Sequence, residues 1–134
     1  MNLNISAPRS GKTSKIADDV NWCLLFGIKP ICLIFPSQLL LRNFEKLYLP
    51  KYNFSKEEQY DINMFKGPQT TSEYAANSIY VFNMIKRIAP LRIYMDDIEY
   101  YDYRFYNELC SLYGDIIYAY GTNKPSKSSP KGRI

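Results

Sequence analysis

The feature of this sequence that most limits its fold is the alternation of short apolar runs with longer amphipathic stretches. A continuous apolar run such as ICLIF at 31–35 is typical of a strand covered on both faces of a sheet. Stretches with apolar residues three or four positions apart are typical of helices that pack one face on a core. The alternation predicts an α/β fold, a three-layer α/β/α sandwich with a largely parallel sheet. We expect strands within residues 2–6, 31–36, 62–67, 91–97 and 115–123, and helices within 12–26, 37–49, 72–89 and 101–113.

Capping residues and apolar spacing predict where the helices end and which faces they bury. Gly27 is a natural C-terminal stop for the first helix, and Ser37 is suited to cap the second, which we expect Pro50 to end. The polar residues 51–61 are expected to form a surface loop. In the helix expected within 72–89, the spacing predicts a buried stripe made of Ala75, Ile79, Phe82 and Ile85.

The chain of 134 residues predicts one domain, residues 1–123, followed by a basic tail at 124–134. The tail contains Lys124, Lys127, Lys131 and Arg133, and no acidic residue follows Asp115. These four residues account for the whole net charge of +4. The tail is expected to be a flexible segment that either contacts phosphate groups or only aids solubility.

Composition excludes several classes of site. The chain contains no histidine, which argues against zinc sites and against Ser-His or Cys-His catalysis. Cys23, Cys32 and Cys110 lack metal-ligand spacing and are expected to be structural thiols in a reducing compartment. The apolar runs are too short to cross a bilayer, and the N-terminus lacks the pattern of a secretion signal. We therefore expect a cytoplasmic protein without membrane contact.

The stretch SAPRSGKT at 6–13 resembles a phosphate-binding loop in which Ser6 replaces the first glycine. Gly11, Lys12 and Thr13 supply the flexible turn, the cation and the magnesium-binding hydroxyl that such a loop requires. The expected strand before the loop and the expected helix after it would aim the helix N-terminus at the phosphates. Glycine at the first position eases an unusual backbone geometry, so serine is a modest handicap.

Two carboxylates follow the expected strand at 91–97. Asp96 and Asp97 would lie at the carboxyl edge of a parallel sheet, where ligands bind. One acid can hold magnesium and the next can orient and deprotonate an attacking water. A plain acid pair at the start of a helix is the alternative, and the occurrence of both motifs in their required contexts favours the nucleotide site. Thr122 and Asn123 end the last strand, either as a polar group between the two motifs or as an ordinary turn.

In motif order, the chain resembles P-loop NTPases with an additional catalytic acid, the group of RecA-like, AAA+ and helicase-type motors. The resemblance implies phosphate binding by Lys12, magnesium binding by Thr13 and Asp96, and water activation by Asp97, with Glu99 as a fallback base. It implies a polar sensor role for Asn123, and it places ICLIF between the phosphate-loop strand and the acid strand. The nucleotide would be held by Ser6, Ala7, Pro8, Arg9, Ser10, Gly11, Lys12, Thr13 and Ser14.

Within this group the sequence is similar to the ATPase domain of viral DNA-packaging terminase large subunits. PICLIFPSQLLLRNFEKLY, INMFKG and YGTNKP suit that comparison, and Arg9 matches an arginine often found inside the loop of such motors. The resemblance implies ATP and Mg²⁺ as ligands and a nucleic acid, double-stranded DNA above all, as partner. For a viral protein it also implies a location in the host cytoplasm. It also implies a homo-oligomer or a partner subunit that supplies an arginine finger; Arg104 and Arg133 are this chain's own candidates.

The expected function is an ATPase that powers nucleic-acid movement. One alternative is a nucleotide-binding assembly module without turnover, since Ser6 and Asp97 depart from the usual residues. Another is a small nucleoside or nucleotide kinase, for which DYRF at 102–105 is a faint signal. In such kinases the acid strand neighbours the phosphate-loop strand directly, so the strand order bears on that choice.

Overall fold

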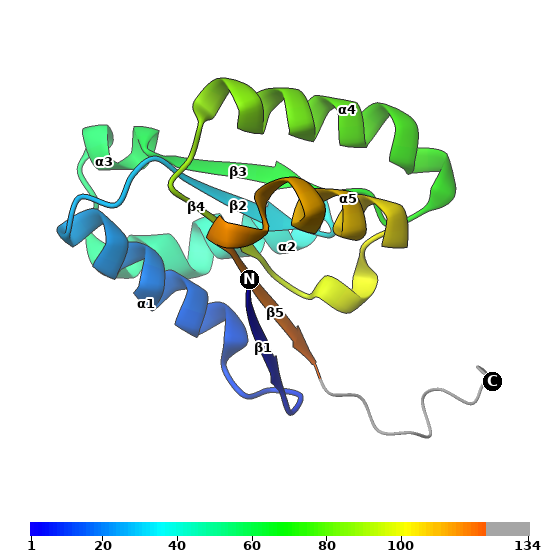
Figure 1. Cartoon of the computed structure of the whole chain (residues 1–134). Helices are drawn as coiled ribbons and strands as arrows, with labels where there is room; N and C mark the ends of the chain where they lie inside the picture. Colours follow the sequence, from blue (N-terminus) through cyan, green and yellow to red (C-terminus); the bar gives the residue numbers. More distant parts are fainter. Residues whose placement is uncertain (123–134) are drawn as a thin grey trace.

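The computed structural model describes residues 1–122 of the chain. These residues form a five-stranded sheet in the order β1-β5-β4-β2-β3, with every neighbouring pair parallel (Figure 1). The strands are β1 (Asn2–Ser6), β2 (Ile31–Phe35), β3 (Ile62–Lys66), β4 (Arg92–Met95) and β5 (Ile117–Thr122). The α-helices are α1 (Lys12–Leu25), α2 (Gln38–Asn43), α3 (Lys56–Tyr60), α4 (Thr71–Ile88) and α5 (Tyr103–Tyr113). The α/β class and the parallel sheet predicted from the sequence are confirmed.

The strand between the phosphate-loop strand and the acid strand is β5, so the expectation that ICLIF would take that place is wrong. β5 pairs with β1 on one side and with β4 on the other, whereas β2 pairs with β4 and β3. Both β2 and β5 are apolar and largely buried, as an inner strand of a parallel sheet must be. Apolar character therefore does not tell which of the two lies between β1 and β4. Strand order depends on where each crossover connection returns to the sheet. The apolar character of a short segment does not determine this position.

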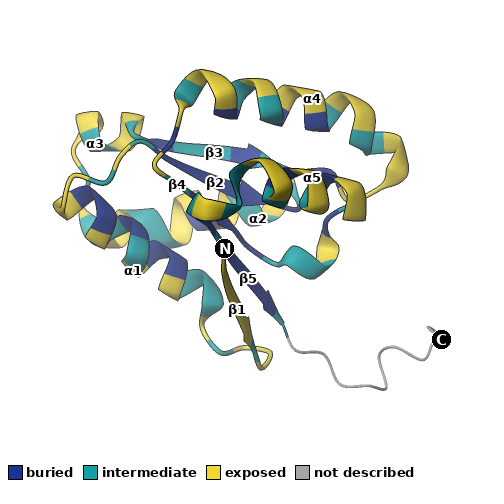
Figure 2. Cartoon of the chain, viewed as in Figure 1, coloured by how far each residue is buried: buried dark blue, intermediate teal, exposed yellow. Residues whose placement is uncertain are grey.

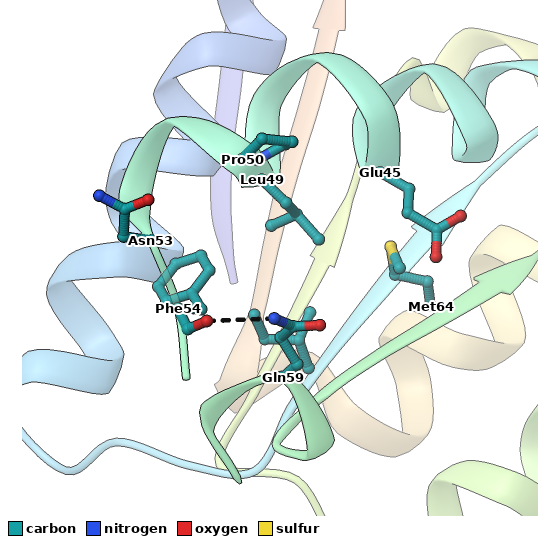
Figure 3. Close-up of a pocket in the computed structure, with 8 residues that line it drawn as sticks. Glu45, Leu49, Pro50, Asn53, Phe54, Gln59 and Met64 are labelled. Carbon is teal, nitrogen blue, oxygen red and sulfur yellow. Dashed lines mark hydrogen bonds between the residues drawn. The ribbon is translucent and has the colours of Figure 1, made fainter. Parts of the chain in front are cut away.

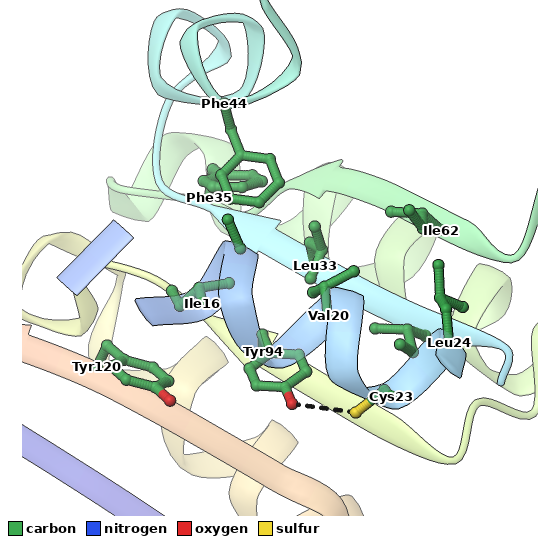
Figure 4. Close-up of a cluster of buried hydrophobic side chains, with 12 residues drawn as sticks. Ile16, Val20, Cys23, Leu24, Leu33, Phe35, Phe44, Ile62, Tyr94 and Tyr120 are labelled. Atoms are coloured by element: carbon green, nitrogen blue, oxygen red, sulfur yellow. Dashed lines mark hydrogen bonds between the residues drawn. The ribbon is translucent and has the colours of Figure 1, made fainter. Parts of the chain in front are cut away.

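The molecule has two core clusters, and alternate side chains along the strands contribute to one or the other. All five residues of β2 are buried, and its odd-numbered residues join a cluster with α1, while Cys32 and Ile34 join one with α4 and α5. Figure 4 shows the first cluster, in which Ile16 and Val20 of α1 lie against β2. In Figure 1, α1 and α4 lie on opposite sides of the sheet.

The buried stripe of α4 agrees only in part with the one predicted. Ile79 is 62% exposed and Ala75 is exposed, whereas Ser78, Val81 and Ile85 are buried. Of the predicted stripe, Ile85 is fully buried and Phe82 is half-buried against the same core cluster. The helix carries apolar residues on more than one face, so spacing alone did not identify the buried one. Packing against β3 and α5 then selects the face that is buried.

The segment after β2 departs from the predicted single helix. Ser37 caps α2 as expected and accepts a hydrogen bond from the Leu40 amide at 3.2 Å. The chain then continues as a π-helix at Phe44–Tyr48 and a 3₁₀ turn at Leu49–Tyr52 that contains Pro50. Residues 51–61, expected to be a loop, include the short helix α3, which a Ser55–Glu58 capping box begins.

Strand β1 is an exposed edge of the sheet, as Figure 2 shows by its colour. Cys23 and Cys32 are buried free thiols, as predicted, and burial raises the pKa of Cys32 to about 12. Cys110, also unpaired, is partly exposed. Within residues 1–122, no helix combines the length and apolar character that crossing a membrane requires.

Candidate functional site

The carboxyl edge of the sheet brings the two motifs together. β1 ends at Ser6, where the loop begins, and β4 ends at Met95, directly before Asp96. β5 lies between these strands, and its last residue, Thr122, is in register with Ser6. Because parallel strands end at one edge, residues far apart in the sequence meet there.

The loop backbone has its unusual geometry at positions other than Ser6. Within residues 1–122, the non-glycine residues with positive φ include Arg9 at 59°, and Gly11 has φ 82°. Ser6 instead completes β1, and its hydroxyl oxygen lies 2.6 Å from that of Ser10. Serine therefore meets no left-handed backbone at the position where the pattern has glycine, and its hydroxyl ties the two sides of the loop together.

The helix that follows the loop begins at Lys12, as the sequence predicts. Gly11, in the left-handed conformation, occupies the N-cap position without a side-chain cap. The first amides of such a helix lack partners within it and carry the positive end of its dipole. Such amides are suited to bind an anion at the point where the loop meets α1.

Asp96 and Thr13 make direct contact in this site. Thr13 donates a hydrogen bond of 2.9 Å from Oγ1 to Oδ2 of Asp96, which is only 2% exposed. Burial, followed by the charge of Asp97, raises the pKa of Asp96 to about 6. The hydrogen bond from Thr13, the amide of Asp97 and the charge of Lys12 act in the opposite direction. Burial of the Asp96 carboxylate thus costs desolvation free energy, and the carboxylate lies beside the Thr13 hydroxyl and under the influence of the Lys12 charge.

Asp97 begins a tight turn directly after Asp96. It has φ 51° and ψ 55°, and its amide donates a hydrogen bond of 2.9 Å to Oδ1 of Asp96. A 3₁₀ turn at Ile98–Tyr100 follows. Both carboxylate oxygens of Asp96 are therefore engaged, which fixes the orientation of this side chain.

The oxygen groups of Thr13 and Asp96 suit Mg²⁺. This ion prefers hard oxygen ligands, and proteins usually hold it with one or two carboxylates plus the phosphates of a nucleotide. Residues 1–122 contain no cluster of three or more residues from the set His, Cys, Asp and Glu that could hold a metal by themselves. The pair is consistent with a metal held jointly by protein and nucleotide.

Of three other predicted residues, Arg104 lies apart from this geometry, and the other two fall in the part of the chain that the structure does not describe. Asn123 and Arg133 lie outside the described residues. The guanidinium of Arg104 lies 4.0 Å from the centre of the Tyr74 ring and 3.5 Å from Oδ1 of Asp102, so it packs between α5 and α4. Of the remaining loop residues, Ala7, Pro8 and Arg9 are exposed, and Ser14 is half-buried.

The structure adds two contacts that the motifs did not indicate. The buried hydroxyl of Tyr101 donates a hydrogen bond of 2.6 Å to the carbonyl of Ile34, which also accepts the Asp96 amide at 3.1 Å. Glu99 accepts a hydrogen bond of 3.2 Å from the Thr122 amide. Neither contact follows from the sequence, because each joins segments that are distant along the chain.

A cavity of about 500 Å³ lies elsewhere in the molecule (Figure 3). Leu49, Phe54, Ile62 and Met64 give it an apolar lining, and Glu45 is at its wall. None of the loop or acid residues lines this cavity, so it is separate from the site described above.

A comparison with protein-family models finds no match to this sequence, and a comparison with curated proteins finds none either. The functional conclusion therefore rests on the residues of the site.

Proposed function

We propose that this protein is a magnesium-dependent, ATP-hydrolysing P-loop NTPase with an additional catalytic acid. The observation that carries the proposal is the 2.9 Å hydrogen bond between Thr13 and the buried Asp96. It joins the hydroxyl of a strand–loop–helix phosphate motif to the carboxylate at the end of another strand. A buried carboxylate with a raised pKa beside a hydroxyl and a cation is typical of functional sites, where a charged ligand offsets the desolvation cost.

Each residue has a distinct task in this proposal. Lys12 and the first amides of α1 stabilise the negative charge that develops on the γ-phosphate. Thr13 and Asp96 would hold Mg²⁺, which would neutralise negative charge on the phosphates when bound. Asp97 orients the attacking water and accepts its proton. Asp97 is shorter than the glutamate usual in this group, so we expect slow turnover in the isolated chain.

The strand order supports this group over a small-molecule kinase. β5 separates the phosphate-loop strand from the acid strand, which in such kinases are direct neighbours. The kinase-like DYRF stretch also has a structural explanation, since Asp102 caps α5 by accepting hydrogen bonds from the amides of Arg104 and Phe105. The two core clusters, with α1 in one and α4 and α5 in the other, support the three-layer arrangement of the P-loop fold.

We propose a nucleic-acid motor as the wider role, with double-stranded DNA as the partner. The support is the resemblance to packaging ATPases and the basic composition of residues 124–134. The resemblance also implies an arginine finger supplied by a second copy or a partner subunit. The contacts of Arg104 with Tyr74 and Asp102 argue against Arg104 in that role.

The test is ATP hydrolysis with and without Mg²⁺ and double-stranded DNA, comparing the wild type with Lys12→Ala. Lys46→Ala, which removes an exposed lysine from the π-helix, is the matched control for loss of one positive charge. We expect magnesium-dependent turnover that DNA raises, that Lys12→Ala abolishes and that Lys46→Ala retains.

Other outcomes would change the conclusion. ATP binding that depends on Lys12 but gives no turnover under any condition would favour the assembly module. No ATP binding by the folded wild-type protein would contradict the proposal as a whole.

A further inference from the structure

The turn after Asp96 holds a carboxylate whose role the motifs leave open. Glu99 lies three residues after Asp96 in the 3₁₀ turn, and its side chain is half-buried. Resting on the proposed ATPase function, we propose that Glu99 is a positioning residue and not a general base. It ties the turn that carries Asp97 to the end of β5 and, through β5, to the phosphate loop.

The first support is the contact of the Glu99 carboxylate. Oε1 accepts a hydrogen bond of 3.2 Å from the amide of Thr122, the last residue of β5. At 3.2 Å this is a hydrogen bond at the long end of the usual N–H···O range, from a backbone amide to a carboxylate oxygen. This hydrogen bond links the 3₁₀ turn directly to the backbone at the end of β5.

The second support is the close packing beside that hydrogen bond. A Cβ atom on Gly121 would lie 2.8 Å from Cγ1 of Ile98, closer than side-chain carbons approach one another. The absence of a side chain at Gly121 lets Ile98 lie directly on β5. Glu99 and Ile98 thus hold the same turn against two adjacent residues of the strand.

The third support is that the far end of the turn is already fixed. The Tyr101 hydroxyl and the Asp96 amide both donate to the carbonyl of Ile34 in β2. Both ends of the segment from Asp96 to Tyr101 are therefore hydrogen-bonded to the same carbonyl oxygen of β2. Glu99 provides the tie to β5, on the other side of β4.

The tie reaches the phosphate loop through the sheet. Thr122 is in register with Ser6, and the Ser6 hydroxyl lies 2.6 Å from that of Ser10 inside the loop. A displacement of the acid turn relative to β5 would change the distance from Asp97 to the bound phosphates. Misplacement of about 1 Å at a reacting group can cost as much as 100-fold in rate.

Two substitutions at one position separate the two roles of Glu99. Glu99→Gln keeps an oxygen that accepts the Thr122 amide but cannot act as a base, whereas Glu99→Ala removes the acceptor. We expect Glu99→Gln to keep kcat within roughly threefold of the wild type and Glu99→Ala to lose roughly tenfold. We expect the KM for ATP to change little in both, because neither substitution touches the loop. Asp97→Asn serves as the reference for loss of the water-orienting acid.

A second measurement does not depend on turnover. In the protein without nucleotide, we expect the Thr122 amide to exchange with solvent slowly in the wild type and in Glu99→Gln. In Glu99→Ala we expect faster exchange at Thr122, while the Ala119 amide inside β5 serves as the internal control. NMR of the labelled chain measures both amides.

Two results would overturn the inference. If kcat falls as far in Glu99→Gln as in Asp97→Asn, Glu99 acts as a general base, since removal of a general base typically lowers the rate by about 100-fold or more. Unchanged kcat and unchanged Thr122 exchange in Glu99→Ala would show that the tie has no role. If the wild type does not hydrolyse ATP, the proposed function fails and the positioning role in hydrolysis fails with it, while the exchange measurement still decides whether Glu99 holds the turn to β5.

Discussion

Thr13 and Asp96 are 83 positions apart in the sequence, and a hydrogen bond of 2.9 Å joins Oγ1 of Thr13 to Oδ2 of Asp96. One residue is in the first turn of α1 and the other directly follows β4. The contact brings together the two halves of the proposed magnesium site.

Removal of the Thr13 hydroxyl should weaken magnesium-dependent nucleotide binding. Thr13→Val preserves the shape of the side chain but leaves Oδ2 of the buried Asp96 without this donor, at a cost of about 1–3 kcal/mol in stability. We expect Thr13→Val to lose roughly tenfold or more in ATP affinity with Mg²⁺ and Thr13→Ser to remain within about threefold. Calorimetric titration with and without Mg²⁺ measures this, and equal affinities for Thr13→Val and the wild type would contradict it.

Asp96→Asn should stabilise the nucleotide-free protein at neutral pH. Burial raises the pKa of Asp96 from 3.8 to about 6, so the folded state binds its proton more tightly than the unfolded state does. The wild type therefore loses stability as the pH rises from about 4 to about 6, by an amount on the order of 3 kcal/mol. We expect Asp96→Asn to be more stable than the wild type at pH 7 and to show no advantage at pH 4. Urea unfolding at both pH values measures the difference, and a constant difference would refute the assignment.

Ser6→Gly should not improve nucleotide binding, although it restores the residue that the loop pattern contains. Ser6 lies at the end of β1, and its hydroxyl contacts that of Ser10. Glycine would lose this contact and add chain entropy, with a cost of about 0.5–1 kcal/mol. Arg9→Gly, at φ 59°, is the matched variant and should stabilise the loop by about 1 kcal/mol. Thermal unfolding and ATP titration test both variants, and tighter binding by Ser6→Gly would show that serine is a defect.

Gly67→Ala should destabilise the fold beside the acid turn. A Cβ atom there would lie 2.9 Å from ring atoms of both Tyr101 and Phe105, which are buried. Overpacking of this kind typically costs about 1–3 kcal/mol. Gly114 has a helical backbone, with φ −51°, and a Cβ atom added to it would meet nothing within 4 Å, so Gly114→Ala is the control and should be neutral or slightly stabilising. Equal unfolding midpoints for the two variants would contradict the packing described here.

Two isoleucines of α4 should respond differently to the same substitution. Ile85 is fully buried, and Ile85→Ala should cost about 2–5 kcal/mol in stability. Ile79 is 62% exposed, so Ile79→Ala should stay within about 0.5 kcal/mol of the wild type. Chemical unfolding of both variants distinguishes the observed stripe from the predicted one, in which both residues are buried.

Most elements and both halves of the site could be predicted from the sequence. The strand before the loop, the start of α1 at Lys12 and the placement of Asp96 after a buried strand all depend on local patterns. Gly11, Lys12 and Thr13 are adjacent in the chain, so the motif that they form can be recognised within one short stretch. Fold class follows from the same local information, because alternating strands and helices favour a parallel sheet.

Tertiary structure decided what depends on contacts between distant segments. β5 and not β2 separates β1 from β4, and Ile79 faces solvent although its spacing fits a buried stripe. The backbone at Ser6 and the tie from Glu99 to Thr122 are likewise invisible in the motifs. The physical reason is that propensity and periodicity act over a few residues, whereas strand order, the buried face of a helix and the partners of a carboxylate are set when the whole chain packs.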